Sequence, residues 1–128
     1  MTKIAERIHI APVGFEVDRI VLPAKQWKAD KVYLLVHDNK SEDKATAWIK
    51  DVKKELKSAK IESEEVHANW RDIEAITKVT RDLLLQLVGN NIYINLASGS
   101  KNHAIALDRA VMTLDEAQRE KIEMFYAE

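Results

Sequence analysis

The sequence predicts a single α/β domain, with a mostly parallel sheet and helices on both of its faces. Stretches with the apolar pattern of strands alternate with stretches of helical period along the whole chain. The clearest strand, Lys31 to His37, is apolar on both faces, which is typical of a central strand in a parallel sheet. Such alternation gives βαβ units with right-handed crossovers, and 128 residues suit one domain of this kind.

Four strands are expected, each short and rich in apolar residues. The first is closed by a proline and a glycine, and the last alternates apolar and polar residues. The third carries three glutamates, and because charges at a sheet edge discourage strand-on-strand aggregation, we place this strand at an edge. The predicted strands are Arg7 to Val13, Lys31 to His37, Ile61 to Val66 and Ile92 to Leu96.

Helices are predicted where apolar residues recur every three or four positions between these strands. A polar segment from Asp38 to Asp43 separates the second strand from the helix that follows it. The predicted helices are Val17 to Trp27, Ala45 to Leu56, Ile73 to Leu87 and Ser100 to Met112.

An extra terminal helix is predicted for residues 113–128. Thr113 and Glu116 have the spacing of a capping box, and the segment ends in Met124-Phe125-Tyr126. Residues 1–128 then form one Rossmann-like three-layer sandwich with a C-terminal helix, and no internal repeat or linker divides them.

Composition and missing motifs exclude several classes of function. The 20 basic and 21 acidic residues give a net charge of −1, so there is no global basic excess to hold a long nucleic acid by counterion release. The chain contains no cysteine, which removes disulfides, cysteine-ligated zinc and thiol catalysis. No apolar run approaches the ~20 residues of a membrane span, and no signal peptide is evident, so we expect a cytoplasmic protein.

The three glycines cannot form either of the common nucleotide-binding motifs. Neither GxGxxG nor GxxxxGK[ST] can be written around them, which argues against ordinary NAD binding and P-loop NTP hydrolysis. The four histidines are far apart in sequence and lack the HExxH spacing. We therefore expect no metal and no cofactor.

The segment Asn95 to Lys101 (NLASGSK) follows the fourth strand and precedes a helix. In this fold class, ligands bind beyond the carboxyl ends of the strands. Gly99 allows close approach of a ligand to the backbone, Ser98 and Ser100 offer hydroxyls, and the first amides of the helix favour an anion. Lys101 adds a positive charge at the same end. The alternative is that a serine only caps the helix, the glycine only makes the turn and the lysine is solvated.

A second segment, Pro12 to Arg19 (PVGFEVDR), follows the first strand at the same edge of the sheet. Gly14 permits close approach, Phe15 can stack on or cover a ligand, and Arg19 can reach a phosphate or a neighbouring subunit. Its two acidic residues are equally consistent with a plain helix start. His37 ends the second strand at this edge and is a further candidate for lining a site.

These residues carry a resemblance to a known family. The stretches HIAPVGFEVDRIVLPAKQWKADKVYLLVHD (His9 to Asp38) and NIYINLASGSKNHAIAL (Asn91 to Leu107) resemble the CRISPR-associated Rossmann-fold (CARF) sensor domains, above all those of archaeal CARF regulators. The Gly-Phe-Glu-x-Asp-Arg loop and the Asn-Leu-Ala-Ser-Gly-Ser-Lys loop are the matching pieces, and the resemblance extends from about Arg7 to Met112.

The resemblance implies a homodimer with one composite pocket for a cyclic oligoadenylate second messenger of type III CRISPR antiviral signalling, commonly the four-adenylate ring. It also implies that a winged helix-turn-helix or nuclease effector follows in longer members. We expect no second domain within these 128 residues, so a stand-alone sensor and a piece of a longer regulator both remain open. Gly14, Phe15 and Arg19 would line the pocket, and Asn95, Ser98, Gly99, Ser100 and Lys101 would hold phosphates and ribose.

Two alternatives remain open from the sequence. Some CARF proteins are metal-independent ring nucleases, in which a ribose 2′-hydroxyl attacks the adjacent phosphate and leaves a 2′,3′-cyclic phosphate. Lys101 and Ser98 would then be the catalytic candidates, because that reaction needs only alignment and charge stabilisation. A nucleotide- or metabolite-binding protein on the same fold is the third possibility, since a fold does not fix a function.

Overall fold

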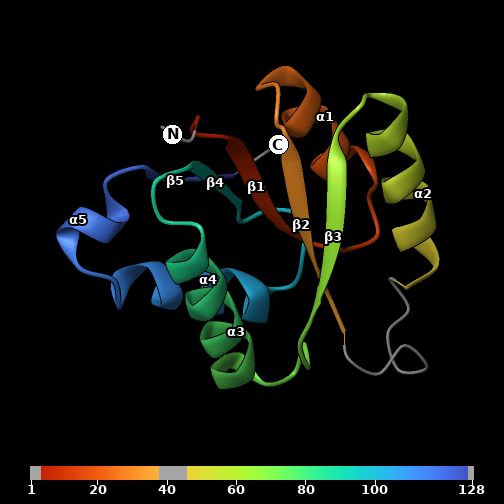
Figure 1. The fold of residues 1–128 in the computed structure, drawn as a ribbon. Coiled ribbons are helices and arrows are strands. Elements are labelled where there is room, and N and C mark those ends of the chain that lie inside the picture. The colour runs from red at the N-terminus through yellow and green to blue at the C-terminus, as the bar shows by residue number, and fades with distance from the viewer. Residues whose placement is uncertain (1–3, 38–45, 127–128) are drawn as a thin grey trace.

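The computed structural model describes residues 4–37 and 46–126, and its centre is a five-stranded sheet (Figure 1). The strand order is β3-β2-β1-β4-β5, and every neighbouring pair is parallel. The predicted polar segment from Asp38 to Asp43 lies outside the described residues. The strands are β1 (Arg7–Pro12), β2 (Lys31–Val36), β3 (Glu62–His67), β4 (Asn91–Asn95) and β5 (Ile122–Phe125).

Helices cover both faces of the sheet, so the predicted Rossmann-like three-layer sandwich is confirmed. Apolar side chains of α1 and α2 join one buried cluster on one face, and those of α3 and α4 join a second cluster on the other (Figure 1). The helices are α1 (Asp18–Gln26), α2 (Thr46–Ser58), α3 (Ile73–Gln86), α4 (Lys101–Met112) and α5 (Glu116–Arg119).

The interior strand β2 shows why the sheet is buried on both faces. Successive side chains of a strand point to opposite faces. Tyr33 and Leu35 accordingly belong to the cluster with α3 and α4, whereas Val32 and Leu34 belong to the cluster with α1 and α2. The continuous apolar pattern of this strand therefore follows from its position between two helical layers, as the sequence predicted. The acidic strand β3 does lie at an edge of the sheet.

The order of the strands fixes where a ligand can bind. From β1 the chain moves outward to β2 and β3, and then returns to the opposite side of β1 to form β4. The connections after β1 and β4 therefore diverge to opposite faces at a topological switch point, where open α/β sheets bind their ligands. The two sequence segments singled out above, Pro12 to Arg19 and Asn95 to Lys101, follow these two strands.

The predicted C-terminal helix is present only as the four-residue α5, and the segment then continues as a strand. Thr113 is the C-cap of α4, and its hydroxyl donates to the carbonyl of Ala110 at 2.8 Å. The next helix begins later, with Asp115 as its N-cap in a capping box with Gln118, and it ends at Arg119. Residues 122–125 then form β5, in which Ile122 and Met124 pack against the cluster beneath α3 and α4.

His9 lies in an aromatic cluster on the face of the sheet that α1 covers. Its ring is 2% exposed, and its centroid lies 5.9, 5.2 and 5.8 Å from those of Trp27, Tyr93 and Phe125. The Nε2 atom of His9 has no hydrogen-bond partner among the described residues. Because this apolar environment disfavours the charged ring, burial lowers the pKa of His9 to about 4.

Candidate functional site

The loop after β1 and the loop after β4 are in direct contact, as the sequence predicted. A Cβ atom added to Gly14 would lie 2.2 Å from the carbonyl oxygen of Ser98, a separation that real structures do not show. A Cβ added to Gly99 would lie 2.6 Å from the ring of Pro12 and 2.8 Å from Nδ1 of His103. Both glycines are therefore required by the packing of the two loops, independently of any ligand.

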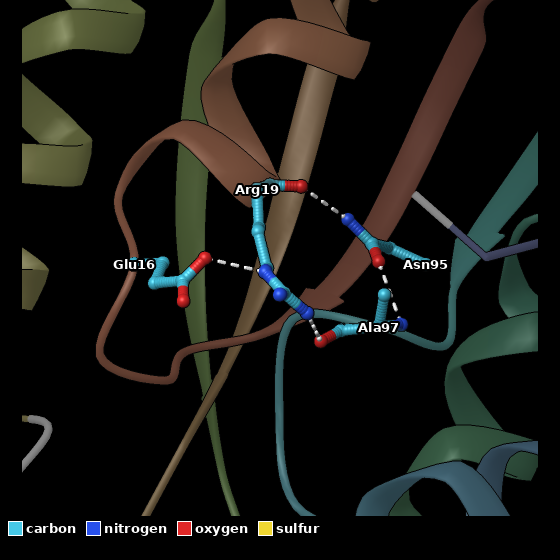
Figure 2. Close-up of polar contacts among 4 residues, drawn as sticks. All are labelled: Glu16, Arg19, Asn95 and Ala97. Carbon is cyan, nitrogen blue, oxygen red and sulfur yellow. Dashed lines mark hydrogen bonds and ion pairs between the residues drawn. The ribbon is translucent and has the colours of Figure 1, made fainter. Parts of the chain in front are cut away.

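Arg19, in the first turn of α1, joins the two loops through its side chain and its backbone (Figure 2). Its Nη1 donates to the carbonyl of Ala97 at 3.3 Å, and its Nε donates to Oε2 of Glu16 at 2.5 Å. Its own carbonyl accepts a hydrogen bond from Nδ2 of Asn95 at 2.7 Å. The start of α1 is thus fixed to the end of β4 and its loop by two hydrogen bonds, while the pair with Glu16 lies within the connection between β1 and α1.

Asn95 is the residue that positions this arrangement. It is 1% exposed, and its Oδ1 accepts from the backbone N–H of Ala97 at 3.0 Å while its Nδ2 holds Arg19 (Figure 2). A buried amide bonded at both ends fixes the direction of the chain as it leaves the strand. Asn95 therefore acts on the site through Arg19 and Ala97.

The two contacting loops border a small pocket of about 220 Å³ that is open to solvent, which we call the loop pocket. Ser98 is 4% exposed, and its hydroxyl has no hydrogen-bond partner among the described residues. An unsatisfied buried hydroxyl costs about 1–3 kcal/mol, so a polar ligand group that reached it after a small movement of the loop would offset that cost. The loop pocket is lined by Gly14, Phe15, Glu16, Arg19, Ala97, Ser98 and Gly99.

The neighbouring serine has a different role. Ser100 is the N-cap of α4, and its hydroxyl accepts from the backbone N–H of His103 at 3.3 Å. In return, Nδ1 of His103 accepts from the backbone N–H of Ser100 at 3.1 Å, which completes a capping box. The capping alternative thus holds for Ser100 and not for Ser98. Lys101 is the first residue of α4 and its side chain is exposed, but it does not line the loop pocket.

His37 does not line the loop pocket. It is 2% exposed at the end of β2, its Nδ1 accepts from the backbone N–H of Trp70 at 3.4 Å, and the two rings lie edge to face at 6.1 Å. Asn102 of α4 donates to the carbonyl of the same Trp70 at 3.2 Å. No sequence pattern connects these three residues, because they come from three separate parts of the chain.

Sequence reasoning also missed two contributors to the pocket and its rim. The sequence pattern is consistent with Glu16 as part of a helix start, but Glu16 pairs with Arg19 three residues later and lines the pocket. The i, i+3 spacing of opposite charges was the available signal. Trp48 of α2 contacts Phe15 edge to face with ring centroids 5.5 Å apart, and Phe15 is 60% exposed on the rim of the pocket.

Within the described ranges, the chain contains neither a cluster of metal-ligating side chains nor a membrane-spanning helix. No three His, Cys, Asp or Glu side chains come together as a group that could hold a metal ion. No helix in these ranges has the length and apolar character needed to cross a bilayer.

The chain is similar to a protein family, to a curated protein sequence and to solved structures. The family model described as "HFX_2341_N:-like, N-terminal" matches residues 7–128. The uncharacterized protein MJ1513 of Methanocaldococcus jannaschii is 30% identical over 121 residues, which is 91% of this chain and 36% of that protein. The chain thus spans about a third of the length of this relative.

Two solved structures share the fold at low sequence identity. Can2 from Sulfobacillus thermosulfidooxidans, in complex with cyclic tetra-adenylate, has a TM-score of 0.74 and 18% identity, over 95% of this chain and 32% of that one. Enterococcus italicus Csm6, bound to cyclic hexa-2′-fluoro-hexa-dAMP, also has a TM-score of 0.74, with 15% identity over 97% of this chain and 34% of that one. The fold is the one that CARF domains have, which confirms at the level of fold the resemblance noted in the sequence.

Proposed function

The chain belongs to the HFX_2341_N-like family of N-terminal domains and has the CARF fold, and we propose from these premises that it is a sensor that binds a cyclic oligoadenylate. The observation that carries the proposal is the loop pocket at the topological switch point. There, Arg19 and Ser98 both line one small open space, and the buried hydroxyl of Ser98 has no hydrogen-bond partner among the described residues. A cation and a hydroxyl donor are groups that bind the oxygens of a phosphodiester.

The local charge matters because the chain as a whole does not attract anions. Its net charge is −1, so the affinity for a phosphate must come from groups at the pocket itself. Arg19 contributes a planar fork of five N–H donors, of which Nε and one on Nη1 are engaged by Glu16 and Ala97. Lys101 adds a second positive charge at the start of α4, in reach of solvent.

The proposal extends to cyclic tetra-adenylate as the ligand and to a homodimer as the binding unit. A pocket of about 220 Å³ is smaller than the ~300–1,000 Å³ of typical small-molecule sites, so one protomer has room for only part of such a ring. A ligand with two-fold symmetry on a two-fold dimer lets each protomer contact an equivalent half. The exposed ring of Phe15 on the rim supports a second copy at this edge.

The biological setting follows from the same premise. A CARF sensor in type III CRISPR antiviral signalling passes the binding of its messenger to an effector, and in longer relatives that effector would be the chain beyond this domain. Because the domain lacks a basic excess, we do not assign it direct binding of long nucleic acid.

A single experiment tests the proposal. The purified protein is incubated in EDTA with cyclic tetra-adenylate and, separately, with cyclic hexa-adenylate. Binding is measured by calorimetry and the integrity of the ligand by chromatography. Binding at one ring per two chains with the ligand intact is the expected result. Linear products with 2′,3′-cyclic phosphate ends would instead identify a ring nuclease. Absence of binding to both rings would refute the sensor and the nuclease together.

A further inference from the structure

The loop pocket contains an acidic residue that a site for anions would not be expected to include. Oε2 of Glu16 lies 2.5 Å from Nε of Arg19, and both residues line the pocket. We propose that Glu16 is a built-in competitor of the ligand: its carboxylate occupies Arg19 in the free protein, and a phosphate of the ligand must displace it. The inference rests on the proposed function, because it concerns how that same site is regulated.

The geometry allows the two anions to exchange on a fixed cation. The backbone of Arg19 is held by the buried Asn95, and its Nη1 is held by the carbonyl of Ala97, so the guanidinium keeps its place. The Glu16 side chain is 62% exposed and lies in the connection between β1 and α1. The carboxylate can therefore move while the arginine stays.

There is also space for the displaced carboxylate. A second open groove of about 400 Å³ adjoins the loop pocket, and Glu16 and Arg19 line both of them. The groove continues past Asp18 and Leu22 toward Tyr126, away from Ser98 and Gly99. A rotation of the Glu16 side chain into this groove would free the Nε–H donor of Arg19 for a phosphate oxygen.

If the two anions exchange on Arg19, loss of the Glu16 charge should raise the affinity for the ligand. Removing the negative charge of Glu16 ends both the competition for Arg19 and the repulsion of the incoming phosphate. For a partly exposed pair of this kind we expect Glu16→Gln to tighten binding of cyclic tetra-adenylate about fivefold, since exposed ion pairs rarely contribute more. The opposite sign is expected if Glu16 accepts hydrogen bonds from ribose hydroxyls or adenine amines, because glutamine is then the poorer acceptor.

The test compares Glu16→Gln with Asp18→Asn by calorimetry with cyclic tetra-adenylate. Asp18 is the matched control: its replacement also removes one negative charge, two residues away, but leaves the ion pair of Arg19 intact. We expect Asp18→Asn to change affinity by less than about twofold. Thermal unfolding of each variant verifies that it is folded. We expect both variants to fold, because the side chains of Glu16 and Asp18 are exposed.

A double-mutant cycle with Arg19→Ala separates exchange on Arg19 from a general charge effect. In the Arg19→Ala background, Glu16→Gln should change affinity no more than Asp18→Asn does. Equal gains from Glu16→Gln and Asp18→Asn, a gain that persists without Arg19, or weaker binding by Glu16→Gln would each overturn the inference while the sensor itself stands. If neither the native protein nor any variant binds a ring, the proposed function fails, and this inference fails with it.

Discussion

The contact between the two loops can be tested by adding one methyl group. In Gly14→Ala the new Cβ would lie 2.2 Å from the carbonyl oxygen of Ser98 and 3.3 Å from its carbonyl carbon. Both neighbours are backbone atoms, so no side-chain rotation relieves the overlap and the loops must separate. Overpacking of this kind costs about 1–3 kcal/mol of unfolding free energy. Separation would also break the bond between Arg19 and Ala97, so we expect a loss of ligand affinity of about tenfold or more.

Gly89 provides a control with a similar cost and a different location. An added Cβ there meets nothing within 4 Å, but the residue has φ +101°, a conformation that side-chain-bearing residues rarely adopt. Gly89→Ala is therefore expected to lose about 1–2 kcal/mol through backbone strain alone. It lies in the turn between α3 and β4, outside the residues that line the loop pocket, so its affinity for cyclic tetra-adenylate should equal that of the native protein.

Urea unfolding followed by tryptophan fluorescence measures the stability of both variants, and calorimetry measures their affinity. We expect similar losses of stability in the two variants and a loss of affinity in Gly14→Ala alone. If Gly14→Ala keeps both native stability and native affinity, the loops are not packed as described. If Gly89→Ala loses as much affinity as Gly14→Ala, the effect on binding reflects global stability and not the pocket.

Two further predictions concern a buried histidine and an exposed lysine. The pKa of His9 is about 4 in the folded protein against 6.5 in the unfolded chain, so the unfolded chain binds more protons between these values. The unfolding free energy that depends on neutral His9 is fully present above pH 6.5. It decreases by about 3 kcal/mol as the pH falls to about 4. His9→Leu should lack this component in urea unfolding at pH 7, 5.5 and 4, and a pH dependence identical to the native one would contradict it. Lys101→Ala should weaken binding of cyclic tetra-adenylate about three- to tenfold by calorimetry, as expected for one lost contact to phosphate. Lys53→Ala is the control, because Lys53 forms an ion pair with Glu65 on β3, and it should leave the affinity unchanged. Equal affinities of the two variants would show that Lys101 is not part of the site.

The alternation of strands and helices could be predicted because each long element carries its own signal. The strand Lys31–Val36 is apolar at nearly every position, and helices of nine to fourteen residues give several turns of apolar periodicity. Element order then fixes the meeting of the two loops, because the carboxyl ends of parallel strands share one edge. The end of the chain could not be predicted this way. The helix Glu116–Arg119 and the strand Ile122–Phe125 have four residues each, which is too short for a repeating apolar pattern to distinguish helix from strand.

At the site, the sequence identified the segments but not the roles of their residues. Ser98 and Ser100 are the same residue type two positions apart. One hydroxyl is buried without a partner among the described residues, and the other caps a helix. The roles of the two hydroxyls differ because of where the helix begins and where the ring of His103 lies. The local sequence pattern predicts neither. Gly99 was expected to make room for a ligand, but the ring of Pro12, from a segment more than eighty residues away, already requires it.

These roles change how substitutions in the segment NLASGSK should be interpreted. Asn95, Gly99 and Ser100 hold the two loops and α4 in place. The Ser98 hydroxyl, in contrast, is buried without a partner among the described residues, and Lys101 is exposed. Replacement of the first group can weaken binding by displacing Arg19 even if those residues never touch a ligand. Replacement of Ser98 with alanine removes an unpaired hydroxyl, so it should leave stability unchanged or slightly higher. A loss of affinity without a loss of stability is therefore the result that distinguishes a ligand contact from a positioning residue in this loop.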